Sequence, residues 1–182
     1  ALNTAEPRAP IPAVNSSAAG AYIFDDLWPG EYYLVFNMPA GMQWRRTLQN
    51  QGANEAIDSD PDETTGRTND FTLESDEDNE DIDAGYFRIA RISDYVWEDN
   101  NGNGLQDGGE PALAGIPISL VDDMGVAVDD ADGNPVANTN SDGAGLYQFT
   151  TLRPGDYRVI FGTIPDFYRT QANAAGGPTH PT

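Results

Sequence analysis

Apolar and polar side chains alternate along several short segments of the chain, which is typical of β-strands with one buried face. In the clearest segments, every second residue is aromatic or aliphatic: Tyr22 and Phe24; Tyr32, Leu34 and Phe36; Tyr157, Val159 and Phe161. The composition predicts further strands at Ile89–Trp97, Ile116–Val121, Phe71–Leu73 and Ala84–Arg88. Gly, Pro, Asn and Asp separate these segments at short intervals, and no stretch of ten residues has a helical period. We therefore predict an all-β sandwich with antiparallel sheets and essentially no long helix.

The pattern occurs twice. In sequence, Gly20–Phe24 aligns with Gly145–Phe149, and Leu27 then aligns with Leu152. Pro29–Phe36 aligns with Pro154–Phe161 without a gap. In each copy a Pro-Gly pair suits the centre of a type II turn, because proline presets the first φ and glycine tolerates the positive second one. Each copy is therefore predicted to be a strand, a turn and a strand.

The two copies divide the chain into two units. We expect residues 1–90, the first unit, to be the C-terminal portion of one β-sandwich module. Residues 91–182, the second unit, are expected to be the N-terminal portion of another module. We expect each copy to be incomplete. The join at Phe87–Ile92 contains no Gly, Pro or Ser run, so we expect the units to abut stiffly and to form a rod.

Charge narrows the choice of partners. The 182 residues carry 30 acidic against 9 basic side chains, a formal net charge of -21. Such a chain repels nucleic acid and anionic membranes, and its self-repulsion favours bound cations. We find no apolar run long enough to insert in a membrane, and Ala1–Gly20 lacks the features of a signal peptide. Nucleic acid and membrane insertion are therefore not expected.

Catalytic signatures are also missing from the sequence. There is no cysteine, so thiol catalysis and thiolate metal sites are excluded. No P-loop, dinucleotide fingerprint or nucleophile with a positioned base is found. Paired carboxylates carry little information in so acidic a chain. We predict that the chain is not an enzyme.

Asp99–Glu110 matches the calcium-loop template D-x-[DN]-x-[DN]-G-x₅-E at every specified position. The spacing suits Ca²⁺ because a hard cation takes roughly six to eight oxygen ligands. The predicted ligands are Asp99, Asn101, Asn103, the Leu105 carbonyl, Asp107 and Glu110. The flanking sequence has strand alternation and helix breakers, so a β frame replaces the helices of an EF-hand. The alternative is a solvated acidic loop.

Several motifs together closely resemble the calcium-binding B repeats of serine-aspartate-repeat surface proteins, which are relatives of collagen-adhesin B-type modules. The second unit carries Tyr95–Asp99, Leu105–Asp107, Gly109–Pro111, Gly115–Leu120, Gly145-x-Tyr147-x-Phe149 and Pro154-Gly155-x-Tyr157. The first unit carries Asp58–Asp60, Gly66–Thr68, Phe71–Leu73 and Ile82–Gly85. The resemblance implies Ig-like or transthyretin-like sandwiches that form calcium-rigidified stalks on bacterial surfaces.

The chain departs from these repeats in two ways. The nine basic residues are all Arg, so the Lys-dependent isopeptide bond of many related modules cannot form. The hairpin region Asp122–Asn140 is longer than is usual in the family. Without isopeptide bonds, calcium is expected to contribute more of the rigidity.

A second metal site is predicted at Asp58, Asp60 and Asp62. Extended backbone would place these three carboxylates on one side, and the resemblance includes the first two. The alternative is an acidic surface loop, and Pro61 and the nearby turn residues favour this interpretation.

Together these features predict a calcium-stabilised structural module of a bacterial extracellular surface protein, such as a stalk, adhesin or filament subunit. The alternative is a carbohydrate- or host-protein-binding β-sandwich that uses loops or Trp28, with its ligand unknown. The expected partners are neighbouring modules of the same kind. The incomplete copies fit either a head-to-tail homopolymer formed by strand addition or a piece of a longer array.

Overall fold

The computed structural model describes residues 11–170, which form short β-strands and a single three-residue 3₁₀ helix. In chain order the elements are β1 (Gly30–Tyr32), β2 (Trp44–Arg46), η1 (Glu55–Ile57), β3 (Phe71–Leu73), β4 (Tyr86–Arg88), β5 (Ala90–Tyr95), β6 (Pro117–Val121), β7 (Thr139–Asn140), β8 (Leu146–Leu152) and β9 (Arg158–Phe161). All strand pairs are antiparallel, so the predicted all-β fold is confirmed. Within the described residues, no helix is both long and apolar enough to cross a bilayer.

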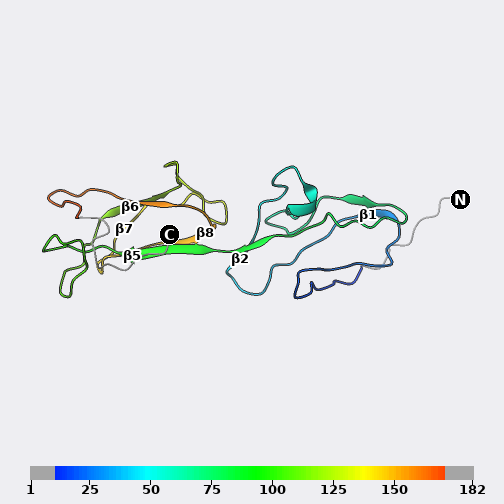
Figure 1. The fold of residues 1–182 in the computed structure, drawn as a ribbon, viewed down its shortest axis with the longest axis horizontal. Helices are drawn as coiled ribbons and strands as arrows, with labels where there is room; N and C mark the ends of the chain where they lie inside the picture. Colours follow the sequence, from blue (N-terminus) through cyan, green and yellow to red (C-terminus); the bar gives the residue numbers. More distant parts are fainter. Residues whose placement is uncertain (1–10, 171–182) are drawn as a thin grey trace.

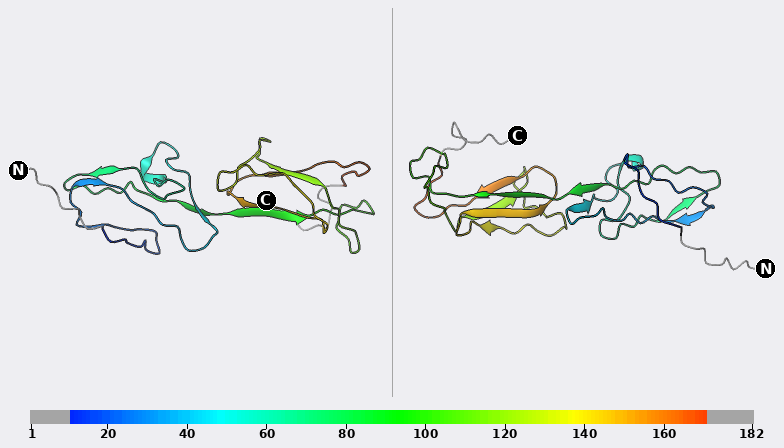
Figure 2. Two further views of the ribbon diagram at one scale, coloured as in Figure 1. Left: turned by 180° about the vertical axis from the view of Figure 1, so that it is seen from behind. Right: turned by 90° about the horizontal axis from the view of Figure 1, so that it is seen from below.

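The two units lie end to end, and the molecule is elongated (Figures 1 and 2). β4 ends at Arg88 and β5 begins at Ala90, so only Ile89 separates the last strand of the first unit from the first strand of the second. The chain therefore crosses the junction almost as one extended segment.

Two side-chain contacts brace this junction. Arg45 Nε and Nη2 donate to the two carboxylate oxygens of Asp132, at 2.5 and 3.1 Å. The Arg153 guanidinium carbon lies 5.4 Å from the centre of the Phe87 ring. Each contact joins one unit to the other, so both restrict bending at Ile89.

The second unit is a small sandwich. β5 pairs with β8, and the facing sheet has the order β7-β6-β9. Alternate side chains of β6 and β8 point between the sheets, as the period of two requires. The buried core consists of Ile118 and Leu120 of β6, Tyr147, Phe149 and Leu152 of β8, and Ile116, which precedes β6.

The described part of the first unit has no such core. Its strands form two separate pairs, β1 with β3 and β2 with β4. The buried side chains there are polar or proline: Arg46, Ser59, Thr68 and Pro61. Arg46 is held by the carbonyl oxygens of Phe36, Glu63 and Thr64. Hydrogen bonds to the backbone, rather than apolar packing, therefore hold the buried residues of this part of the unit in place.

The predicted strands are confirmed where a partner strand is present. β3 has the bounds predicted from the sequence, and β4, β5, β6 and β9 lie inside or across their predicted segments. Tyr22–Phe24 differs, since residues 21–25 form no strand although the matching residues 146–152 form β8. The physical reason is that β8 bonds to β5, and no described segment occupies the equivalent position in the first unit.

Candidate metal centre

The loop 99–110 is closed at its base by antiparallel β structure. Trp97 and Ala112 form a bridge, and the Glu98 N–H donates to the Pro111 carbonyl at 2.9 Å. The loop therefore projects from a β frame, as its flanking sequence predicts. It leaves the end of β5 that lies away from the junction with the first unit (Figure 1).

Asp99 organises the first half of the loop. Its Oδ1 accepts the N–H groups of Gly102 and Asn103 at 2.8 and 3.2 Å, and its Oδ2 accepts that of Gly104 at 2.7 Å. Both glycines have positive φ, 70° and 78°, which glycine adopts without strain. Desolvation acts to raise the pKa of Asp99, but the hydrogen bonds from these backbone N–H groups and from the Thr170 side chain outweigh it and hold this pKa below its ordinary value. Asp99 is therefore a fixed carboxylate at neutral pH.

Asn101, Asn103 and Asp107 meet in the middle of the loop. Each asparagine donates an amide N–H to Oδ2 of Asp107 at 2.8 Å. The Asn101 Oδ1 accepts the Asn103 N–H at 3.0 Å, and the Asn103 Oδ1 accepts the Leu105 N–H at 2.7 Å. The two amide groups bring partial positive charge to a single carboxylate oxygen, which is the kind of charge that a cation would supply.

Glu110 closes the loop with both of its oxygens. Oε1 accepts the Asn100 N–H and Oε2 accepts the Asp107 N–H, each at 3.0 Å. The predicted side-chain ligands are thus linked by hydrogen bonds within one loop. Their all-oxygen chemistry, with three carboxylates, fits a hard divalent cation.

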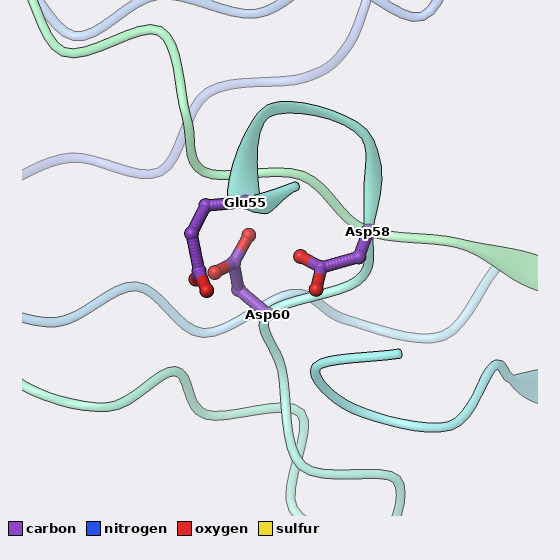
Figure 3. A group of neighbouring side chains, drawn as sticks. All are labelled: Glu55, Asp58 and Asp60. Carbon is purple, nitrogen blue, oxygen red and sulfur yellow. The ribbon is translucent and has the colours of Figure 1, made fainter. Parts of the chain in front are cut away.

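A second acidic group lies in the first unit. Among the described residues, the ligand oxygens of Glu55, Asp58 and Asp60 lie within 4.8 Å of one another. Figure 3 shows the Asp60 carboxylate between those of the other two residues. The Asp58 Oδ1 is buried and has no hydrogen-bond partner. A buried oxygen without a partner is costly, and a cation is one group that would satisfy it.

The structure brings together Asp58 and Asp60 of the predicted second site, but the Asp62 carboxylate bonds to a neighbouring turn instead. The Asp62 Oδ1 accepts the N–H groups of Thr64 and Thr65 and the Thr65 hydroxyl, at 2.7 to 3.1 Å. These bonds, that from the Thr65 N–H first, lower the pKa of Asp62. Its carboxylate therefore stabilises a turn.

The sequence did not indicate Glu55 as a ligand of the second site. η1 turns the chain so that Glu55 and Asp58, three residues apart, lie on one side, since a 3₁₀ helix has three residues per turn. The spacing of Glu55 and Asp58 was the available signal, but no periodic pattern marks so short a helix.

The surroundings of Asp60 change the pKa of its carboxyl group. Desolvation, and then the nearby charges of Asp58, Asp83 and Glu55, raise the pKa of Asp60, while a bond from the Asp83 N–H opposes them. Tyr22 lies near Asp60 and Asp83 and donates its hydroxyl to the Ile82 carbonyl at 2.6 Å. Burial, with the charges of Asp83 and Asp60, raises the pKa of Tyr22 to about 12. Positive charge near Asp60 would relieve this repulsion.

Comparison with known proteins identifies similar chains. The family model described as the SdrD B-like domain matches residues 3–86 and 90–180. Serine-aspartate repeat-containing protein F of Staphylococcus epidermidis (strain ATCC 12228 / FDA PCI 1200) is 34% identical over 165 residues, which cover 90% of this chain and 9% of that protein. Serine-aspartate repeat-containing protein D of Staphylococcus aureus (strain Newman) is 34% identical over 161 residues, which cover 88% of this chain and 11% of that protein. The chain therefore spans about a tenth of the length of these relatives, and the resemblance inferred from its motifs is confirmed.

Proposed function

The chain belongs to the SdrD B-like domain family, and from that premise we propose that it is a calcium-stabilised structural module of a bacterial extracellular surface protein. Its role is mechanical: it spaces and stiffens a stalk, adhesin or filament. Its partners are neighbouring modules of the same kind. A non-catalytic role agrees with the lack of catalytic motifs in the sequence.

The observation that carries this proposal is the hydrogen-bonded set of oxygen ligands in the loop 99–110. Asp99, Asn101, Asn103, Asp107, Glu110 and the Leu105 carbonyl would hold Ca²⁺. The ion would supply the divalent charge that ties these oxygens together. A loop with a preformed first half loses less conformational entropy on binding than a disordered one, which favours useful affinity.

The setting of the loop favours a structural ion over a signalling switch. In a sensor EF-hand, calcium opens a pair of helices. Here the loop starts and ends on the bridge between Trp97 and Ala112, which leaves no pair of helices to open. The net charge of -21 adds to the benefit of a bound cation, because self-repulsion destabilises the folded chain.

We assign a second, weaker cation site to Glu55, Asp58 and Asp60. Its support is the partnerless buried Oδ1 of Asp58 and the raised pKa of Asp60. A cation there would offset the repulsion among the three carboxylates. Asp62, predicted from the sequence, is left out of this site because its carboxylate is not among the three that lie within 4.8 Å of one another, and its Oδ1 bonds to the turn at Thr64 and Thr65.

Stiffness is supported by the junction between the units. A one-residue link at Ile89 and the bidentate contact of Arg45 with Asp132 oppose bending. The end-to-end arrangement suits a spacer, because each added unit lengthens the rod (Figure 2).

Thermal denaturation with and without calcium tests the proposal. We expect excess chelator to lower the melting temperature, and added calcium to raise it again in a concentration-dependent way, because a ligand that binds only the folded state stabilises it. Magnesium at equal ionic strength is the control, since it is smaller and demands a stricter octahedral geometry. A melting curve that is the same in chelator and in calcium would contradict the calcium role.

A further inference from the structure

Two Asn-Gly pairs follow each other in the loop 99–110, at Asn101-Gly102 and Asn103-Gly104. No other asparagine of the sequence precedes a glycine. Both asparagine side chains are exposed to water. Asparagine is among the chemically labile residues, and glycine has no side chain to obstruct the approach of its nitrogen to the preceding side chain. The loop therefore brings together the two asparagines of the chain that are most open to attack from the backbone.

The reaction available to such a pair is deamidation. The glycine N–H gives its proton to water or hydroxide, and its nitrogen forms a bond to Cγ of the preceding asparagine. The bond from Cγ to Nδ2 breaks, and the departing nitrogen takes up a proton and leaves as ammonia. Water then opens the resulting succinimide ring to aspartate or isoaspartate. In sum, a side-chain amide and a water molecule give a carboxyl group and ammonia, so the reaction needs no other reactant.

Asp99 holds the two attacking nitrogens. The Gly102 N–H donates to Oδ1 of Asp99 at 2.8 Å, and the Gly104 N–H donates to Oδ2 at 2.7 Å. A hydrogen bond to a carboxylate is roughly twice as strong as one between neutral groups, so it opposes the loss of the glycine proton. Neither nitrogen is free to attack its asparagine while it stays bonded to Asp99.

Asp107 holds the two side-chain amides. Nδ2 of Asn101 and Nδ2 of Asn103 both donate to Oδ2 of Asp107, each at 2.8 Å. Their Oδ1 atoms accept the N–H groups of Asn103 and Leu105, at 3.0 and 2.7 Å. A rotation that turns either Cγ toward the following nitrogen would break these bonds. Both reacting groups of each pair are therefore restrained while the loop is closed.

We propose that Asn101 and Asn103 are sites of self-deamidation, and that the hydrogen bonds to Asp99 and Asp107 control its rate. In the closed loop both amides persist. Opening of the loop frees the glycine nitrogens and the side-chain amides together, because all of these bonds lie within the one loop. The extent of deamidation then records how long the loop has been open. This inference rests on the hydrogen bonds and not on the calcium role.

The two products change the loop in different ways. The calcium-loop template accepts Asp as well as Asn at positions 101 and 103, so the aspartate product keeps the pattern of oxygens and adds a negative charge. In the isoaspartate product the backbone runs through the side-chain carbon, which lengthens the loop by a methylene group. The residues that follow then lose their register with Asp99. Deamidation therefore alters both the charge of the loop and its closure.

Peptide mapping of the 182-residue chain by mass spectrometry tests the proposal. The chain is aged in mildly alkaline buffer with chelator, either folded or unfolded in guanidinium chloride, and the conversion of each asparagine to an acid is followed with time. We expect Asn101 and Asn103 to convert at least about 10-fold more slowly in the folded chain, because the reaction needs local opening. Asn134 is the internal control, since Pro135 has no N–H to attack it, and its amide should persist in both states.

Two variants separate the bonds of the loop from the general protection that folding gives. Asp99→Ala frees the glycine nitrogens, and Asp107→Ala frees Nδ2 of both asparagines. Each change should raise both deamidation rates in the folded chain about 5-fold or more, because a bond to a charged acceptor is lost. Asp123→Ala, in another exposed loop of the second unit, is the matched control and should leave both rates unchanged. Near-UV circular dichroism verifies that each variant is folded.

The outcomes are distinct. Equal rates in the folded and unfolded chains would overturn the proposal, and so would folded Asp99→Ala and Asp107→Ala chains that deamidate no faster than the native chain. The proposal also fails if neither asparagine converts in the unfolded chain, because the two Asn-Gly pairs would then be unreactive.

Discussion

Replacing Glu110 by Gln isolates the contribution of the metal. The substitution keeps the size of the side chain and one carbonyl oxygen, but it removes the charge and the second acceptor. Without metal, either the Asn100 or the Asp107 N–H loses its 3.0 Å bond to the side chain. The loop is largely exposed, so water takes over much of that bond, and the loss is at most about 1 kcal/mol.

With metal, the expected loss is larger. A ligand at 100 times its Kd stabilises the folded state by about 2.7 kcal/mol, and that stabilisation disappears when the variant no longer binds it. For a domain of roughly 60–100 residues, 1 kcal/mol shifts the melting temperature by about 4–8 °C. The expected decrease is therefore about 10–20 °C in calcium and about 8 °C or less in chelator.

Circular dichroism melting curves of the native chain and Glu110→Gln, each in calcium and in chelator, measure this difference. Asp123→Asn is a matched control, because it also removes one negative charge from an exposed loop of the second unit. Equal decreases for Glu110→Gln in the two buffers would refute the reasoning, since the loss would then come from the protein alone.

Three further predictions concern the frame. Leu152→Ala should lower the free energy of unfolding, measured by urea denaturation, by about 2–5 kcal/mol. Leu27→Ala, at the equivalent but half-buried position, should lower it by less than half of that amount. Equal losses would show that the two leucines are buried to the same extent. Arg46→Leu should destabilise the first unit by about 2–4 kcal/mol, because it leaves buried carbonyls without a donor, and an unchanged urea midpoint would contradict this bonding role. The bond to Arg45 lowers the pKa of Asp132, so its stabilising effect is present above the unfolded pKa and is lost as the pH falls through the folded one. The pair is exposed, so Asp132→Asn should lower the free energy of unfolding by no more than about 1 kcal/mol at pH 7, and this loss should disappear as the pH falls through the folded-state pKa, as measured by urea titrations over a series of acidic pH values.

The sequence predicted those parts of the fold whose signal is local. β3 and β6 alternate apolar and polar residues with a period of two, and both appear where the alternation lies. The β frame of the loop 99–110 was equally predictable, since the residues before it alternate and Gly115 and Pro117 exclude a following helix.

Other features depend on residues distant in the chain. Tyr22–Phe24 has the pattern of β8, yet it forms no strand because a strand needs a bonded neighbour. β2 carries Arg46 on its buried side, so a polar residue hides the alternation. The carboxylate group of the first unit takes Glu55 in place of Asp62 because η1 and the Thr64–Thr65 turn set the directions of these side chains.

Titration of calcium into the metal-free chain, followed by NMR of the backbone amides, tests the calcium site most directly. We predict that the amides of residues 99–110 shift together along one saturable curve, and that Glu110→Gln abolishes this curve. The amides near Glu55, Asp58 and Asp60 should follow a separate, weaker curve. Shifts that spread evenly over the acidic surface without saturating, or a loop that responds identically in Glu110→Gln, would contradict the assignment of calcium to this loop.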